Sequence, residues 1–270
     1  MDTDERKKMI QQGFDTVAQG YDHPALSFFP ETAKRMMGHL ALADDKKLLD
    51  VCTGTGVVAL AAAGQLANGK VTGIDLSSGM LEQARSKAEQ YQLNNIEFKQ
   101  MDLDHLDFPE AFFDIATSSF GLFFLDDMSR GLNNIVKVVK PGGRIAISSF
   151  TNDAFSPMTD LFVTRYESFG REVPGLSWKR LSTHELIKEL FAQVGIGDVE
   201  IHHEPLGYYM TSPQEWWDVV WNAGYRGLLN QLSEEERVEF KVQHLEEIED
   251  LINKDRVWFN TEVLIAIGQK

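Results

Sequence analysis

From Lys47 onward, short apolar runs alternate with helical segments, and this alternation constrains the fold more than any other feature of the chain. Strands rich in valine and isoleucine, with helices between them, are typical of parallel sheets covered by helices on both faces. The predicted strands are residues 48–52, 71–75, 95–101, 113–119, 144–150, 199–205 and 258–267. The sequence therefore predicts an α/β fold with a doubly wound, mostly parallel, seven-stranded Rossmann-like sheet.

The helical segments divide this single predicted domain into four parts. A helical N-terminal segment (10–42), interrupted at Pro24 and Pro30, precedes the core of alternating elements (47–150). The core helices are expected at 57–67, 78–91 and 129–139. A variable segment follows at 151–183, and residues 184–270 are expected to complete the sheet around a helical insert at 208–256.

Three helices of the second half are predicted to begin at Ser-x-x-Glu, where each side chain hydrogen-bonds the other residue's free backbone N–H. The pairs are Ser182 with Glu185, Ser212 with Glu215 and Ser233 with Glu236. The second helix is expected to carry one apolar stripe of Trp217, Trp221, Tyr225, Leu228 and Leu232. The third is expected to bury Val238, Val242, Leu245 and Ile252.

Charge and composition argue against a nucleic-acid partner, a membrane helix, an internal disulfide and a metal site. The 270 residues include 26 Lys and Arg against 41 Asp and Glu, for a formal charge of −15, which argues against a nucleic-acid partner. No run approaches the ~18 apolar residues of a membrane helix, and no secretory signal is visible, so a cytoplasmic protein is expected. One cysteine excludes an internal disulfide, and the histidines lack ligand spacing, so no metal site is expected.

The stretch from Leu49 to Gly56 carries the strongest functional signal, because it is a strand that turns through glycines into a helix. Such a turn places a ligand against backbone at the positive end of the helix dipole. Asp75 follows Gly56 by 19 residues, the spacing at which an acid accepts hydrogen bonds from both ribose hydroxyls. The glycine pattern also fits a dinucleotide. Asp50, however, would repel a pyrophosphate and attract an ammonium or sulfonium, which favours S-adenosyl-L-methionine over NAD.

Further motifs follow in order: Gly73–Ser77, Gln100–Leu103, Ser118–Leu122 and Val138–Arg144, with Phe14–Asp22 before them. Together with the glycine turn, they resemble the class I S-adenosylmethionine-dependent methyltransferases, and in particular the ubiquinone/menaquinone-biosynthesis C-methyltransferase group. The resemblance covers about residues 10–150. Cys52 and Thr53 depart from the smaller residues more usual in the quinone methylators, and Cys52 is expected to be a small buried strand residue rather than a nucleophile.

The resemblance implies S-adenosyl-L-methionine as cofactor and gives each matching residue an expected role. Asp50 would lie near the methionine ammonium, Asp75 would hold the ribose, and Asp102 would meet the adenine amino group. The other cofactor-binding residues it implies are the turn Thr53, Gly54, Thr55 and Gly56, the adenine neighbours Leu76, Met80 and Leu103, Ser119 at the methionine end, and Tyr21 folding over the cofactor.

The expected activity is methyl transfer to a small-molecule acceptor, apolar or aromatic, with C-, O-, N- and S-methylation left open. The N-terminal segment and the insert would form a lid, with Trp216 and Tyr208–Tyr209 as pocket candidates. If the acceptor must lose a proton, the candidate groups are Tyr21, His23, His202 and Tyr208. Two alternatives stay open at this point: an NAD-dependent dehydrogenase, and a cofactor-binding accessory protein without transfer activity.

Overall fold

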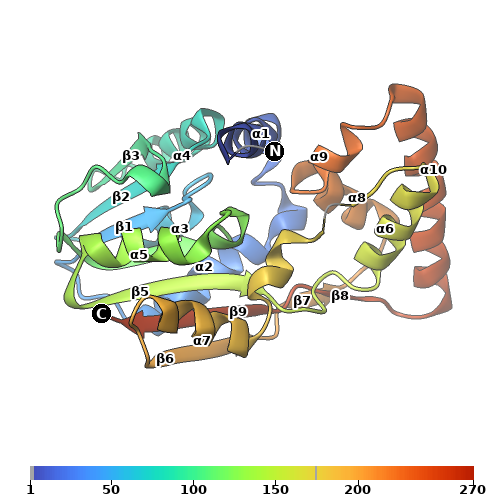
Figure 1. Ribbon diagram of the computed structural model, residues 1–270. Helices are drawn as coiled ribbons and strands as arrows, with labels where there is room; N and C mark the ends of the chain where they lie inside the picture. The colour runs from blue at the N-terminus through green and yellow to red at the C-terminus, as the bar shows by residue number, and fades with distance from the viewer. Residues whose placement is uncertain (1–2, 174) are drawn as a thin grey trace.

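A seven-stranded sheet forms the centre of the computed structural model, which describes residues 3–173 and 175–270 (Figure 1). Its strand order is β3-β2-β1-β4-β5-β9-β6, and only β9 runs antiparallel to its neighbours β5 and β6. The strands are β1 (Lys47–Val51), β2 (Lys70–Asp75), β3 (Ile96–Gln100), β4 (Phe113–Ser119), β5 (Val139–Phe150), β6 (Val199–Glu204) and β9 (Val263–Gln269). The predicted doubly wound, mostly parallel sheet is therefore confirmed.

Helices cover the sheet as the alternating pattern requires. On one side α2 (Phe28–Leu40) packs against α3 (Val57–Ala63), and on the other α5 (Met128–Val138) packs against α7 (His184–Gln193). At the amino-terminal end of the chain, α1 (Thr3–Val17) lies beside α4 (Ser78–Gln90) (Figure 1). Pro30 does not interrupt a helix, contrary to expectation. It lies in the first turn of α2, where its missing N–H would have no partner in any case.

Between β6 and β9 the chain forms the helical insert, which Figure 1 shows at one end of the sheet. It contains α8 (Pro213–Asn222), α9 (Arg226–Leu229) and α10 (Glu234–Lys254), and α6 (Met158–Ser168) packs against α10. The predicted single aromatic helix is wrong, because Ala223 adopts an extended backbone and separates α8 from α9. Short connections occur as 3-10 turns at 18–20, 24–26, 103–105, 122–124 and 177–181.

The predicted last strand also divides in two. β8 (Trp258–Asn260) pairs with β7 (Gly207–Tyr209) in a separate two-stranded ribbon, and β9 begins at Val263 in the main sheet. Phe259 lies opposite Tyr208 in the ribbon, whereas Val263 lies opposite Glu204 in the main sheet. The apolar run at 258–267 therefore contributes one strand to each of two sheets, and its composition does not indicate this division.

One of the three predicted capping boxes is confirmed. Glu236 N–H donates to Ser233 Oγ at 3.1 Å, and Ser233 N–H donates to Glu236 Oε2 at 2.8 Å. At α7 the prediction is wrong, because Thr183 caps the helix while the Ser182 hydroxyl donates to the carbonyl of Lys179.

At α8 the box is also absent. Ser212 makes no capping hydrogen bond with its side chain, because Glu215 instead accepts from the backbone N–H and the hydroxyl of Thr211. The helix still begins where predicted, with Pro213 in its first turn.

The buried face of α10 differs from the predicted one. Val238 and Val242 are 61% and 54% exposed, and the side chains turned inward are Phe240, His244 and Ile248. Leu245 and Ile252 are only partly buried. α6 and α8 pack against α10 and bury the side that faces them. The positions of the valines in the sequence therefore predict the wrong face. Among residues 3–173 and 175–270, no helix combines the length and apolar character needed to span a bilayer.

Candidate functional site

A cavity of about 140 Å³ opens at the carboxyl ends of β1, β2 and β4, the usual ligand position in open α/β sheets. Hereafter it is called the nucleoside cavity. It is lined by every residue predicted to bind cofactor except Gly56. These lining residues are Tyr21, Asp50, Thr53, Gly54, Thr55, Asp75, Leu76, Met80, Asp102, Leu103 and Ser119. Residues up to 98 positions apart in the sequence are thus brought to one site.

The glycine turn after β1 is built from left-handed backbone. Cys52, Gly54 and Gly56 have φ angles of 54°, 54° and 81°. A methyl group added to Gly54 would meet nothing within 4 Å, so this position is open towards the cavity. Gly56 has a different role, since a Cβ there would lie 3.0 Å from Ala84 Cβ and 3.1 Å from the Phe98 ring. It allows α3 to pack closely instead of lining the cavity.

Asp50 is a buried carboxylate facing the nucleoside cavity. Its oxygens accept hydrogen bonds from the hydroxyls of Thr53 at 2.6 Å and Thr117 at 2.7 Å. Burial raises the pKa of Asp50 to about 6, although both hydroxyl bonds act in the opposite direction. No ion pair with Asp50 is found among the described residues, so the site favours a ligand that carries its own positive charge.

Asp75 ends β2 and is held in one orientation by backbone donors. Gly54 N–H donates to its Oδ2 at 2.8 Å and Ser77 N–H to its Oδ1 at 2.9 Å. Burial raises the pKa of Asp75, and these backbone hydrogen bonds oppose that effect. A carboxylate oxygen can accept two hydrogen bonds, so each oxygen of Asp75 can still accept one from a ribose hydroxyl.

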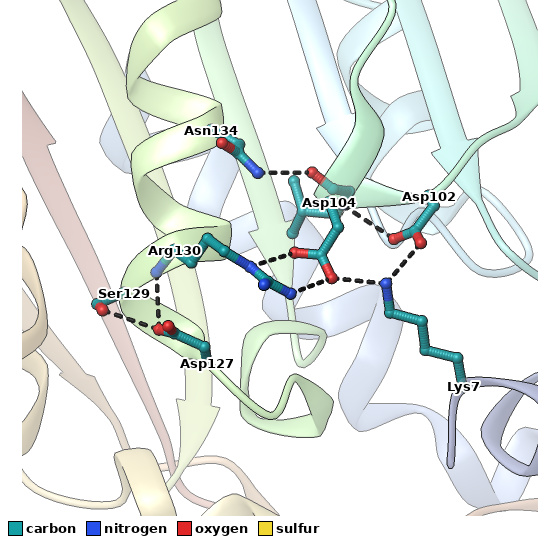
Figure 2. Close-up of polar contacts among 8 residues, drawn as sticks. Lys7, Asp102, Asp104, Asp127, Ser129, Arg130 and Asn134 are labelled. Atoms are coloured by element: carbon teal, nitrogen blue, oxygen red, sulfur yellow. Dashed lines mark hydrogen bonds and ion pairs between the residues drawn. The ribbon is translucent and has the colours of Figure 1, made fainter. Parts of the chain in front are cut away.

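Asp102 is already engaged by the N-terminal helix (Figure 2). Lys7 Nζ on α1 lies 2.6 Å from Asp102 Oδ2 and 2.5 Å from Asp104 Oδ2. Asp104 is in turn held by Arg130 on α5 through two hydrogen bonds of 3.0 and 2.6 Å. The side-chain amide of Asn134, labelled in Figure 2, donates to the carbonyl of the intervening Leu103 at 3.2 Å. The adenine side implied by the resemblance is thus bounded by a lysine that no sequence motif indicated.

Of the four proton-transfer candidates, Tyr21 lines the nucleoside cavity. Its ring stacks on Phe29, with centroids 5.0 Å apart and planes inclined by 17°. Burial and the nearby carboxylates of Asp75 and Asp22 raise the pKa of Tyr21 well above its usual value. The phenol therefore stays protonated near neutral pH and acts as a hydrogen-bond donor rather than a base.

The other three candidates lie elsewhere. His23 caps a 3-10 turn, with its Nδ1 accepting from Ala25 N–H at 3.2 Å. His202 on the edge strand β6 stacks on His39 at 3.6 Å, and Tyr208 packs against Phe259 in the β7–β8 ribbon. None of the three lines either cavity described here, so their placement does not favour a role in proton transfer.

A second cavity of about 230 Å³ adjoins the first and is called the aromatic cavity. Its lining comes from α2, the segments after β4 and β5, residues 173–178 as far as described, and the α8–α9 junction. The aromatic residues in it are Phe14, Tyr21, Phe28, Phe29, Phe120, Phe123, Phe124, Phe150, Phe155, Trp178 and Tyr225. None of its described lining residues is charged.

The predicted pocket residues of the insert are replaced by others. Trp216 is fully buried, and its indole N–H donates to His244 Nε2 at 2.7 Å, so it belongs to the core. Tyr209 is half exposed on the ribbon. Tyr225 is buried in the core and also lines the aromatic cavity, together with Trp178, which no sequence pattern indicated. The phenylalanine pairs at 28–29 and 123–124 were the available signal in the sequence.

Cys52, the first residue after β1, lines the nucleoside cavity and is partly buried. Burial, with Asp75 and Asp50 nearby, raises the pKa of its thiol strongly. The thiol therefore stays protonated, which disfavours a role as nucleophile. The expected buried strand position is wrong, because Cys52 lies in the turn after β1, with a φ of 54°, at the wall of the cavity.

Comparison with known proteins gives the family. A methyltransferase domain family matches residues 48–143. The chain is 34% identical over 157 residues to the ubiquinone/menaquinone biosynthesis C-methyltransferase UbiE of Geotalea daltonii, covering 56% of this chain and 67% of that protein. The chain belongs to the class I S-adenosylmethionine-dependent methyltransferases. The predicted family and cofactor are thereby confirmed, and the NAD-dependent alternative is not supported.

Two further relatives are also named as methyltransferases. It is 33% identical over 144 residues to the aklanonic acid methyltransferase DauC of Streptomyces, covering 53% of this chain and 66% of that protein. It is 36% identical over 142 residues to the demethylmenaquinone methyltransferase of Lactiplantibacillus plantarum, covering 50% and 60%. The chain thus spans about two thirds or less of these two relatives.

Solved structures agree on the fold. The YcgJ protein of Bacillus subtilis superposes with a TM-score of 0.61 at 20% identity, covering 89% of this methyltransferase and 98% of that protein.

Proposed function

We propose that this protein transfers the methyl group of S-adenosylmethionine to a planar aromatic small molecule held in the aromatic cavity. One observation carries the proposal: the two cavities share five lining residues, and all five are aromatic. They are Phe14, Tyr21, Phe29, Phe120 and Phe124. A group held in one cavity reaches a group held in the other across this shared wall. The quinone names of two relatives, a demethylmenaquinone methyltransferase and a ubiquinone/menaquinone biosynthesis C-methyltransferase, support the same class of acceptor.

The residues of the nucleoside cavity fit the cofactor. The unpaired carboxylate of Asp50 suits the methionine ammonium, and Asp75 at the end of β2 suits the ribose hydroxyls. Gly54 leaves open space where a side chain would stand, and Met80 and Leu76 supply an apolar surface. When bound, S-adenosylmethionine supplies a methyl carbon already activated by its sulfonium.

The chain itself contributes position and aromatic faces. The shared wall sets the approach of the acceptor, and such positioning accounts for several kcal/mol of barrier in general. Aromatic faces also attract a cation such as a sulfonium, by about 0.5–2 kcal/mol. The described lining of the aromatic cavity contains no carboxylate, imidazole, amine or thiol, and Tyr21 stays protonated. The acceptor is therefore proposed to lose its proton to solvent rather than to a side chain.

A titration followed by an acceptor screen tests the proposal. S-adenosylhomocysteine is titrated calorimetrically into wild type, into Asp75→Ala and into the matched control Asp198→Ala, whose aspartate is exposed on the surface. We expect binding to wild type and to the control, and loss of binding in Asp75→Ala. Absence of binding to wild type would refute the proposal at its base.

The screen then presents phenols and quinols with S-adenosylmethionine and detects methylated products by mass spectrometry. A product that disappears in Trp178→Ala, while S-adenosylhomocysteine still binds, would place the acceptor in the aromatic cavity. Cofactor binding without product from any acceptor would instead favour the non-catalytic accessory protein. A nucleic-acid partner is not proposed, because the charge of −15 disfavours it.

A further inference from the structure

The N-terminal helix covers the nucleoside cavity with one face. The residues of α1 that line the cavity follow helical spacing and are Thr3, Arg6, Lys7, Ile10, Gln11 and Phe14. A helix that presents three to four such positions per two turns lies along the cavity rather than touching it at one point. α1 is therefore a wall of the cavity over most of its length.

The two halves of α1 are held in different ways. Its carboxyl-terminal half is fixed to α4, because Asp15 Oδ1 accepts from the Ser77 hydroxyl at 2.6 Å and from Gly79 N–H at 2.9 Å. Val17, the only buried residue of α1 among those described, packs with Met80 in a small apolar cluster. The amino-terminal half has no buried side chain and is held mainly by charged contacts.

The charged contacts come from Lys7, which Figure 2 shows beside Asp102 and Asp104, and from Arg6. Lys7 pairs with both Asp102 and Asp104, and Arg6 Nη1 lies 2.7 Å from Asp126. Asp104 is the fixed partner, since its side chain is only 6% exposed and Arg130 binds it from α5. Burial lowers the pKa of Lys7, but the two carboxylates raise it overall, so the lysine stays charged.

We propose that Lys7 is a cofactor-retaining latch: it fastens the amino-terminal half of α1 over the nucleoside cavity, and the latch opens when the cofactor leaves. The proposal rests on the proposed function, because it requires S-adenosylmethionine or its product in this cavity. Lys7 is a positioning residue that acts through α1. The latch acts at the dissociation step, so it controls how fast S-adenosylhomocysteine departs after transfer.

Dissociation kinetics test the latch. The dissociation rate of S-adenosylhomocysteine is measured by stopped flow for wild type, Lys7→Met and the control Lys8→Met, in which the neighbouring lysine is exposed on the same helix. We expect Lys7→Met to raise this rate by roughly fivefold, which corresponds to the upper end of the range for a solvent-accessible ion pair, and Lys8→Met to leave it unchanged. Lys7→Arg, which keeps the charge, should restore most of the wild-type rate.

Salt provides a readout that a merely structural role would not move. Raising NaCl from about 0.05 M to about 0.5 M should speed dissociation from wild type more than from Lys7→Met, because the variant lacks the Lys7 ion pairs and keeps only the Arg6–Asp126 pair for salt to screen. Lys7→Met and Asp104→Asn together should raise the rate by less than the product of their separate effects.

Three results would overturn the latch: an unchanged rate in Lys7→Met, a salt-insensitive wild type, or independent effects of the two substitutions. If Lys7→Met does not fold, the salt dependence of the wild-type dissociation rate and the dissociation rate of Lys7→Arg still test the latch. Wild type that binds no S-adenosylhomocysteine would instead refute the proposed function, and calorimetry shows that outcome separately.

Discussion

Replacing Asp50 by asparagine should stabilise the ligand-free protein near neutral pH. The carboxyl group ionises at an ordinary pKa of 3.8 in an unfolded chain, but burial raises the pKa of Asp50 to about 6 in the fold. At ~1.4 kcal/mol per pH unit, this difference corresponds to about 3 kcal/mol of folding free energy. Because Asp50 is fully buried, exposure to solvent does not reduce this value.

The direction with pH follows from proton binding. Between pH 3.8 and about 6 the folded protein holds a proton that the unfolded chain has released, so raising the pH destabilises the fold. The destabilisation by the charged carboxylate is absent below pH 3.8 and has its full value above about pH 6. Asparagine does not ionise. Its amide oxygen can accept from one of the hydroxyls of Thr53 and Thr117, and its NH2 can donate to the other. The variant therefore avoids the free energy of burying a charge.

Urea unfolding of the ligand-free protein measures the effect. Asp50→Asn should be more stable than wild type by up to about 3 kcal/mol at pH 7.5, and the gain should fall to about 1 kcal/mol near pH 4.5. Asp198→Asn, at an exposed site, should show no gain at either pH. A variant less stable than wild type at pH 7.5 would refute the reasoning.

The same substitution should weaken ligand binding selectively. S-adenosylhomocysteine carries the ammonium proposed to pair with Asp50, whereas 5′-methylthioadenosine lacks it. Asp50→Asn should therefore lose affinity for the first ligand and keep it for the second. In wild type, affinity for S-adenosylhomocysteine should decline as the pH falls through about 6. Equal losses for both ligands would show that Asp50 acts on the shape of the cavity instead.

Three further perturbations test the fold and the aromatic cavity. Trp216→Phe removes the indole donor from the buried His244 ring and should cost about 1–3 kcal/mol of unfolding free energy, measured in urea; an unchanged midpoint would contradict it. Gly73→Ala places a Cβ 2.6 Å from the Phe98 ring and should cost about 1–3 kcal/mol, seen as a lower Tm; an unchanged Tm would contradict it. Trp178→Phe should raise KM for the acceptor several-fold while the calorimetric Kd for S-adenosylhomocysteine stays unchanged, and a parallel change in both would argue against separate cavities.

Much of the site on the sheet was predictable because it is encoded locally. The glycine turn after β1 and the acids Asp50 and Asp75 follow from strand periodicity, from glycine's access to positive φ and from a fixed spacing between two strand ends. Parallel pairing of β1 with β2 then brings these acids to the same edge of the sheet. Ser233 and Glu236 were likewise predictable, since a capping box involves only neighbouring residues.

Other features were decided only by tertiary packing. Ala223 breaks a helix that the apolar stripe would have continued, and α10 buries the side that α6 and α8 happen to cover. The aromatic wall and the pair of Lys7 with Asp104 join segments far apart, 97 residues in the second case. The sequence by itself determined the sheet, the glycine turn and its acids, because their geometry depends on neighbours along the chain. The second cavity and the latched helix depend on which distant surfaces meet, and no local pattern specifies that.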